Sequence, residues 1–200
     1  MAANPELPVL SVPGGMMSHM ASNVLVRPAH GGDPAVIGSI QARAWGLAYA
    51  SLLPAPALAA LNPEELTPVW REAVLRPPSP KHGVFVAVSD DLVIGFAAVA
   101  PSDDKDATEG VGSLGVLAVD PGYQRAGHGS RLLAAAVDHL RGHGLTSMTV
   151  WVPEADEPRA TFFASAGMVA DGARRSFAGT DGATVTEARY GADIAESSDA

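Results

Sequence analysis

One glycine-rich stretch constrains the fold of this chain more than any other segment. The stretch DPGYQRAGHGSRLL (120–133) follows the apolar run LGVLAVD (114–120), and the Asp-Pro step between them ends a strand. After the stretch, apolar residues recur at helical spacing up to about residue 143. They would form one buried stripe of Leu132, Leu133, Ala136, Val137 and Leu140. The segment therefore predicts a strand, a glycine loop and a helix in immediate succession.

A loop of this kind can bind a phosphate group, because backbone N–H groups and the positive end of the helix dipole converge on it. Gly127 and Gly129 would allow a close approach that a Cβ would block, and Arg125 and Arg131 could add charge-assisted hydrogen bonds. The Walker pattern G-x-x-x-x-G-K-[ST] is absent, and Leu132 stands where the dinucleotide motif G-x-G-x-x-G needs glycine. A purely structural connection between strand and helix is the alternative.

Strand and helix signals alternate through the rest of the chain. Further strands are expected at 23–28, 147–152, 168–177 and 184–190, with a hairpin over 84–100 that turns at Asp90-Asp91. Further helices are expected after Asp33-Pro34, after Asn62-Pro63 and at 158–166. The order β-α-α-β-β-β-α-β-α-β-β predicts an α/β fold with a mixed, mostly antiparallel central sheet and flanking helices.

Length and composition indicate one globular domain. The 200 residues carry a net charge of −9, which disfavours a nucleic-acid partner. No window reaches the roughly 18 apolar residues of a membrane span, and residues 1–20 lack the pattern of a signal peptide. The absence of cysteine excludes disulfides and thiol catalysis and favours a cytoplasmic protein. The domain would span 22–190, between a flexible lead (1–21) and a flexible tail (191–200).

Two segments resemble the GNAT superfamily of N-acetyltransferases. QRAGHG (124–129) is similar to the family's acyl-CoA signature Gln/Arg-x-x-Gly-x-Gly/Ala, and WVPEADEPRATFFASAGM (151–168) is similar to its following strand and helix. The resemblance implies an acyl-CoA N-acyltransferase fold with acetyl-CoA as co-substrate and no metal. It also implies that the backbone of residues 125–130 holds the CoA pyrophosphate. Strand 114–119 would pair with the pantetheine and splay from strand 147–152.

The resemblance also assigns the residues around acetyl-CoA. A backbone N–H of the strand, at Leu117 or Val119, would polarise the thioester carbonyl in an oxyanion-type role, which makes Leu117 a catalytic candidate. The expected cofactor contacts are Leu117, Val119, Gln124, Arg125, Ala126, Gly127, His128, Gly129, Ser130, Asp156 and Phe163.

Several positions depart from the family pattern. Asp156 stands where an asparagine is common, and Phe163 stands where a tyrosine usually protonates the leaving thiolate. Met168 replaces the aromatic residue that usually follows the segment's glycine. Phenylalanine cannot donate a proton, but a thiol with a pKa of about 8.5 is a tolerable leaving group as the anion. We therefore expect solvent to protonate the thiolate.

The sequence contains no obvious general base. Many relatives carry a glutamate on the strand before the glycine loop, near the positions of Ser113 and Gly115 here. Glu109 just upstream and Glu154 after the next strand are the candidates for direct or water-mediated proton abstraction. Each of them could instead be a solvated surface carboxylate. Without a strong base, an acceptor amine of low pKa is favoured.

Aromatic residues are the candidates for contacting the acceptor. Trp45 and Tyr49 lie four residues apart on one helical face, where they could contact a cationic amine or pack in the core. Trp70 has the same two interpretations, with packing favoured.

Two further pairs have weaker signals. His139 and His143 have the i, i+4 spacing of zinc ligands, but the pattern offers no third ligand, so we expect no metal site. Arg174-Arg175 is either surface charge or a contact to a CoA phosphate.

Together these features predict an N-acetyltransferase. It would transfer an acetyl group from acetyl-CoA to a primary amine, on a small molecule or a protein N-terminus, by direct attack in a ternary complex. The alternatives are a CoA-binding regulatory module that has lost its acid and base, and an acyltransferase for a longer acyl group. Members of the family often dimerise, so a homodimer is an expected assembly.

Overall fold

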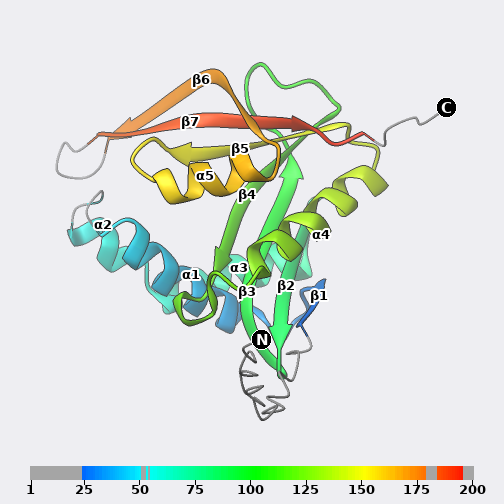
Figure 1. Cartoon of the computed structure of the whole chain (residues 1–200). Coiled ribbons are helices and arrows are strands. Elements are labelled where there is room, and N and C mark those ends of the chain that lie inside the picture. Colours follow the sequence, from blue (N-terminus) through cyan, green and yellow to red (C-terminus); the bar gives the residue numbers. More distant parts are fainter. Residues whose placement is uncertain (1–23, 51–52, 54, 179–183, 196–200) are drawn as a thin grey trace, which may run out of the picture.

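The apolar runs of the sequence pair into one mixed sheet, shown in Figure 1. The structure is a computed structural model that describes residues 24–50, 53, 55–178 and 184–195. The strands are β1 (Val24–Pro28), β2 (Gly83–Ser89), β3 (Leu92–Pro101), β4 (Val111–Val119), β5 (Ser147–Pro153), β6 (Val169–Ala178) and β7 (Thr184–Asp193). The helices are α1 (Pro34–Ala48), α2 (Ala55–Ala60), α3 (Pro63–Leu75), α4 (His128–Gly142) and α5 (Glu157–Ser165), with a 3-10 turn η1 (Pro121–Tyr123) after β4.

The predicted fold class and element order are confirmed, with one addition. The sheet has the order β1-β2-β3-β4-β5-β7-β6, and all its pairings are antiparallel except that of β4 with β5. The short helix α2 was not predicted, because six residues are too few to show helical spacing. The predicted turn at Asp90-Asp91 is confirmed, and both residues have the positive φ angles, 48° and 64°, that a two-residue hairpin turn of type I′ requires.

The packed domain extends beyond the end that the sequence predicted. We expected a flexible tail from residue 191, but β7 continues to Asp193 and Ile194 is only 4% exposed. The backbone N–H of Ile194 also donates to the Thr146 carbonyl at 2.8 Å. A lone apolar residue has no periodicity to reveal its burial, which is why the sequence placed the boundary too early. The predicted lead (1–21) and residues 196–200 lie outside the described part of the chain.

Helices cover both faces of the sheet (Figure 1). Under α4 and α5 lies the larger core, which includes Leu132, Leu140 and Phe163 together with Met148, Val150 and Val152 of β5. Under α1 and α3 lies a second core, which includes Ile37, Ile40, Trp70 and Phe96. Four residues of the stripe predicted for the helix after the glycine loop are buried, and the fifth, Val137, is partly buried against the same core. None of the described helices is long and apolar enough to cross a membrane.

The strand β4 separates from β5 soon after both begin. The parallel pairing joins only Val111, Gly112 and Ser113 to Ser147, Met148 and Thr149. Beyond that point β5 stays hydrogen-bonded to β7 through Pro153, while β4 stays paired with β3 through Val119. On the β3 side the register slips at Gly115, which has no partner, and a bulge of this kind increases local twist. The predicted splay between the two strands is confirmed.

The close approach of β3 to β4 beneath α4 requires glycine at position 95. A Cβ on Gly95 would lie 2.9 Å from the Ala118 backbone oxygen and 3.2 Å from Leu132 Cδ1. We predict that Gly95→Ala lowers the free energy of unfolding by about 1–3 kcal/mol, because the backbone oxygen cannot move away. Urea denaturation measures this effect. The control is Gly46→Ala in α1, where a Cβ would meet nothing within 4 Å and should add up to about 1 kcal/mol. Equal effects of the two substitutions would contradict the prediction.

Candidate functional site

The glycine loop is held at the end of β4 by hydrogen bonds from its own residues. The side chain of Asp120 accepts a hydrogen bond from the Gly122 backbone N–H at 3.1 Å and another from Arg43 Nε of α1 at 3.0 Å. Gln124, the first residue of the signature, donates from Nε2 to the Val119 carbonyl at 3.0 Å. These contacts fix the turn η1 and aim the following residues at the start of α4.

The loop backbone is shaped to bind an anion. Arg125 and Gly127 have φ angles of 63° and 80°, in the left-handed region. Left-handed residues alternating with others turn successive N–H groups to one side and make a concave anion site. Gly127 is the N-cap of α4 and provides no side-chain cap hydrogen bond. The first N–H groups of α4 therefore remain available to a ligand at the positive end of the helix dipole.

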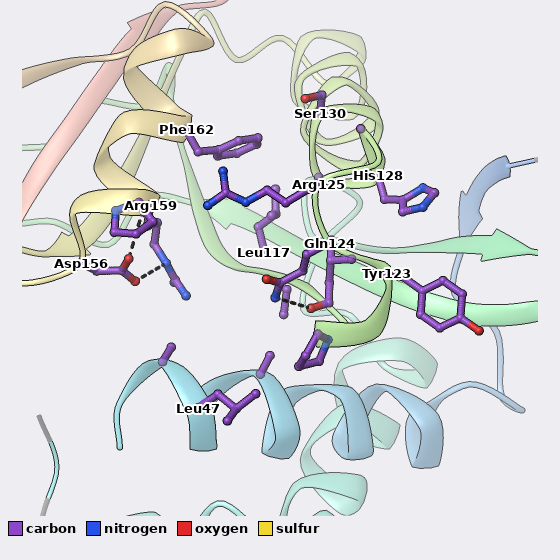
Figure 2. Close-up of a pocket in the computed structure, with 18 of the residues that line it drawn as sticks. Leu47, Leu117, Tyr123, Gln124, Arg125, His128, Ser130, Asp156, Arg159 and Phe162 are labelled. Carbon is purple, nitrogen blue, oxygen red and sulfur yellow. Dashed lines mark hydrogen bonds and ion pairs between the residues drawn. The ribbon is translucent and has the colours of Figure 1, made fainter. Parts of the chain in front are cut away.

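A cavity of about 610 Å³ opens beside this loop, shown in Figure 2. Its walls are the last residues of β4, the second half of α1 and the first turns of α4 and α5. All the cofactor contacts expected from the sequence line it except Ala126, which lies between two lining residues. Those that line it are Leu117, Val119, Gln124, Arg125, Gly127, His128, Gly129, Ser130, Asp156 and Phe163.

Sequence reasoning missed the rest of the cavity wall. Arg159 follows Asp156 by three residues, and its Nε lies 3.1 Å from an Asp156 carboxylate oxygen at the start of α5. Asp156 also accepts a hydrogen bond from the Arg159 backbone N–H at 3.1 Å, so it is the N-cap of this helix. Figure 2 shows the Arg125 side chain extending toward Phe162 and the Arg159 side chain beside Asp156. The Asp-x-x-Arg spacing was visible in the sequence, whereas the contribution of Leu47 from α1 was not.

The phenylalanine in place of the family's tyrosine is a core residue. Phe163 is 2% exposed and packs in the core under α5, with its ring centroid 5.1 Å from that of Phe162. Phe162 is the more open of the two rings and faces Gly129, where a Cβ would lie 3.5 Å from it. The cavity therefore has an aromatic wall at this position and no hydroxyl.

His128 contributes its backbone more than its imidazole. The residue is 6% exposed, and its Nδ1 is buried without a hydrogen-bond partner among the described residues. Burial lowers the pKa of His128, and the charge of Arg131 lowers it further. The ring is therefore neutral at ordinary pH, and the positive character of the loop comes from N–H groups and arginines.

The carboxylates proposed as bases lie outside the cavity wall. Glu154 follows β5 and is partly exposed, with an oxygen 2.6 Å from Arg174 Nε. Glu109 is exposed in the connection between β3 and β4. Arg174 and Arg175 both pair with glutamates rather than lining the cavity.

None of the three aromatic candidates lines the cavity. Trp70 packs edge-on against Phe96 and donates from Nε1 to Gln41 at 2.6 Å, as expected for a core residue. Trp45 and Tyr49 pack edge-to-face with ring centroids 5.6 Å apart, and neither lines the cavity. Burial raises the pKa of Tyr49, the charge of Arg159 opposes that rise, and the charges of Glu187 and Asp156 add to it. The charges of Arg159 and Asp156, which line the cavity, therefore act on Tyr49.

His139 of α4 and the C-cap residue His143 form no metal site with other residues in the described ranges. His139 and His143 have ring centroids 4.3 Å apart. Across the described part of the chain, no three His, Asp, Glu or Cys side chains are grouped to hold a metal ion.

Comparisons with known proteins agree with this geometry. Residues 47–168 match the family model described as the Acetyltransferase (GNAT) family. The protein named Uncharacterized N-acetyltransferase YuaI, from Bacillus subtilis (strain 168), is 34% identical over 133 residues, which cover 66% of this chain and 72% of that protein.

Solved structures show the same fold. The PaiA N-acetyltransferase of Thermoplasma acidophilum in complex with coenzyme A has a TM-score of 0.68 at 16% identity, covering 85% of this chain and 98% of that chain. YncA of Salmonella typhimurium, with its cofactor acetyl-CoA, has a TM-score of 0.68 at 20% identity, covering 90% of this chain and 98% of that chain.

The raised pKa of Tyr49 predicts a loss of stability at high pH. An unfolded tyrosine titrates near pH 10, whereas the buried hydroxyl keeps its proton to a higher pH. Between the two pKa values the unfolded state binds fewer protons, so the free energy of unfolding falls as pH rises, by at most about 1.4 kcal/mol per pH unit. Denaturant unfolding from pH 8 to 11 should show a smaller fall for Tyr49→Phe than for the unsubstituted protein. Parallel pH dependences would contradict this assignment.

Proposed function

This chain belongs to the GNAT family of acetyltransferases, and we propose that it transfers an acetyl group from acetyl-CoA to a primary amine by direct attack in a ternary complex. The amine would belong to a small molecule or to a protein N-terminus. The observation that carries the proposal is the cavity where β4 and β5 separate. There the anion-binding loop meets the edge of β4 that is not paired with β5. Acetyl-CoA is the co-substrate of the family and fits both features.

Each part of the site has a separate task in this proposal. The backbone N–H groups of residues 125–130, with Arg125, would hold the pyrophosphate. The edge of β4 beyond Ser113 lacks a strand partner on the β5 side, so its N–H and C=O groups can pair with the amide groups of pantetheine. An N–H of Leu117 or Val119 would then donate to the thioester oxygen as negative charge develops on it.

Phe163 indicates how the leaving group departs. Its buried ring offers no proton to the thiolate, and a thiol with a pKa of about 8.5 can leave as the anion. The proton then comes from solvent, which reaches the cavity at its open side. The site therefore lowers the barrier through positioning and through stabilisation of the oxyanion more than through acid catalysis.

The protonation of the acceptor favours amines of low pKa. A lysine-like amine with a pKa of about 10.4 is neutral in about one molecule in 2,500 at pH 7, which costs about 4.6 kcal/mol before attack. An α-amine with a pKa near 8 costs only about 1.4 kcal/mol. We infer that α-amines are the better acceptors.

A CoA-binding regulatory module is the second candidate. Phe163 supports it, as does the pairing of Asp156, the cavity's carboxylate, with Arg159. Turnover separates the two functions, because both would bind acetyl-CoA.

Release of the CoA thiol tests the proposed function directly. The chain has no cysteine, so a thiol reagent reports only the CoA that is set free. With acetyl-CoA and a panel of amines that spans pKa 7–11, we expect amine-dependent release that is fastest for α-amines. Tight binding of acetyl-CoA without release on any amine would favour the regulatory module. Faster release on lysine-like amines than on matched α-amines would contradict the inferred preference.

Substitution of Gly127 tests the role of the loop. Gly127→Ala places a Cβ at a φ of 80°, which costs about 1–2 kcal/mol and distorts the anion site. The matched control is Gly144→Ala after the other end of α4, with a φ of 78° and nothing within 4 Å of the added Cβ. Both variants should lose similar stability. Only Gly127→Ala should raise the Kd of acetyl-CoA, by about tenfold or more. Equal acetyl-CoA affinity in the two variants would contradict this placement of the pyrophosphate.

A further inference from the structure

A buried carboxylate that the mechanism above does not use lies on β7. Glu187 is 7% exposed, and the other buried acidic side chain of the described residues is Asp33, which is 3% exposed. Asp33 accepts two hydrogen bonds from Arg27, at 2.7 and 3.0 Å, and one from the His30 backbone N–H at 2.7 Å, so it fixes the start of α1. Glu187 has one hydrogen bond in the described part of the chain, from Arg175 Nε to Oε2 at 2.6 Å.

This pairing leaves Glu187 able to accept further hydrogen bonds. An ionised carboxylate has about four lone-pair sites, and the second oxygen of Glu187 is not among the buried polar atoms of the described residues that lack a partner, so it is open to solvent or to a ligand. The Arg175 side chain is 50% exposed, so its charge is shared with water. A second cation beside the free oxygen would therefore be favourable.

The register of the sheet places Glu187 at the open part of the splay. Glu187 is paired with Pro153 at the end of β5, well past the last β4–β5 pair of Ser113 with Thr149. Counting onward along the two parallel strands brings Pro153 level with Leu117 and Ala118 of β4. Glu187 therefore lies across the splay from the strand segment proposed to hold the thioester.

Side chains alternate between the two faces of the sheet along β5 and β7, and this alternation shows on which face Glu187 lies. Val150 and Val152 of β5 point into the core beneath α4 and α5. Trp151 lies on the opposite face, and its strand partner Arg189 has its guanidinium carbon 5.6 Å from the Trp151 ring centroid. Glu187 is two residues from Arg189 and so shares that face, which is the face away from the helix that begins at the anion loop. An acceptor bound there would approach the thioester from the side opposite α4.

Arg175 and Tyr49, from two other elements, interact with Glu187. Arg175 comes from β6, with its guanidinium carbon 4.5 Å from the Trp151 ring centroid. Tyr49 comes from the end of α1, and the charges of Glu187 and Asp156 both contribute to its raised pKa. Asp156 itself lines the cavity from the start of α5. The register thus places the carboxylate across the splay from β4, and its charge acts on Tyr49, the aromatic residue that the sequence suggested as an acceptor contact.

We propose that Glu187 binds the ammonium group of the acceptor and takes its proton before attack, an assignment that rests on the proposed acetyl transfer. One N–H proton of the ammonium moves to the Glu187 carboxylate, and the amine nitrogen then forms the bond to the acetyl carbon. The carbon–sulfur bond breaks with its electron pair on the thiolate. The nitrogen's second proton and the proton held by Glu187 are released, one reaching the thiolate through solvent and the other entering bulk water. The products are the amide and free CoA.

Glu187→Gln tests this role without removing the bond to Arg175, because the amide oxygen can still accept from Arg175 Nε. The probes are glycinamide, which has an α-amine, and benzylamine, each titrated by calorimetry into the protein saturated with CoA. We expect the substitution to weaken amine binding about tenfold or more. We expect it to lower kcat/KM for the amine by about 100-fold while the Kd of acetyl-CoA stays unchanged.

Asp171→Asn provides the matched control. Asp171 also joins β6 to β7 through an arginine, with its carboxylate 2.6 Å from Arg189 Nε. Its variant should keep amine affinity within about twofold, because Arg189 keeps its bonds to Asp104 and Asp106 and so still holds the strands together. If the Glu187→Gln variant proves unstable, Glu187→Asp provides a second test. Because it keeps the charge, it should retain part of the activity.

The outcomes separate this inference from the proposed function. If Glu187→Gln behaves like Asp171→Asn, or if Glu154→Gln causes the large loss instead, the role of Glu187 is overturned. If the unsubstituted protein releases no CoA on any amine, acetyl transfer fails, and the calorimetric titration still decides whether Glu187 binds an ammonium group. Failure of the unsubstituted protein to bind either amine would overturn the assignment as well.

Discussion

The early divergence of β4 from β5 is the constraint on which the rest of the site depends. Only three residue pairs join the two strands, after which β5 bonds to β7 and β4 keeps a free edge. Backbone groups at the wall of a cavity need hydrogen-bond partners, and a strand-like ligand can supply them. The bulge at Gly115 adds twist at the point of separation. The cavity, the proposed pantetheine site and the position of Glu187 all follow from this divergence.

The closed end of the splay is held by a charged cluster around Arg189. Its guanidinium donates to Asp104 at 3.2 Å, to Asp106 at 2.6 and 2.7 Å and to Asp171 at 2.6 Å. The hydrogen bonds that Arg189 donates to these aspartates raise its pKa, and the bonds to Asp106 contribute most. Asp104 also accepts from Trp151 Nε1 at 3.0 Å. The cluster thereby ties the connection between β3 and β4 to β5, β6 and β7, and holds together the end at which β4 and β5 pair.

The two sides of the cleft have different chemistry. The anion loop provides N–H groups and Arg125, and α5 adds Arg159, so this side has the positive character that suits a pyrophosphate. The side of β7 provides a buried carboxylate beside aromatic rings, which suits a cation. In the proposed reaction, two substrates of opposite charge would therefore reach one reaction centre from opposite faces of the sheet without competing for the same groups. The net charge of −9 gives the chain an overall attraction for cations that agrees with this division.

The sequence by itself determined the features that depend on residues close together along the chain. The strand, glycine loop and helix at 114–143 were predictable because Asp-Pro, the glycines and the leucine stripe act through local backbone geometry and helical spacing. The residues expected to contact acetyl-CoA came instead from the resemblance of 124–129 and 151–168 to the GNAT pattern, and all but Ala126 line the cavity. The tertiary structure alone decided which distant residues meet. Glu187 pairs with Arg175 and lies near Tyr49 only because β6, β7 and α1 are brought together by the sheet order and the packing of the helices. How deeply Glu187 is buried and which charges act on it depend on contacts between residues far apart in the sequence. No local sequence pattern could therefore predict them.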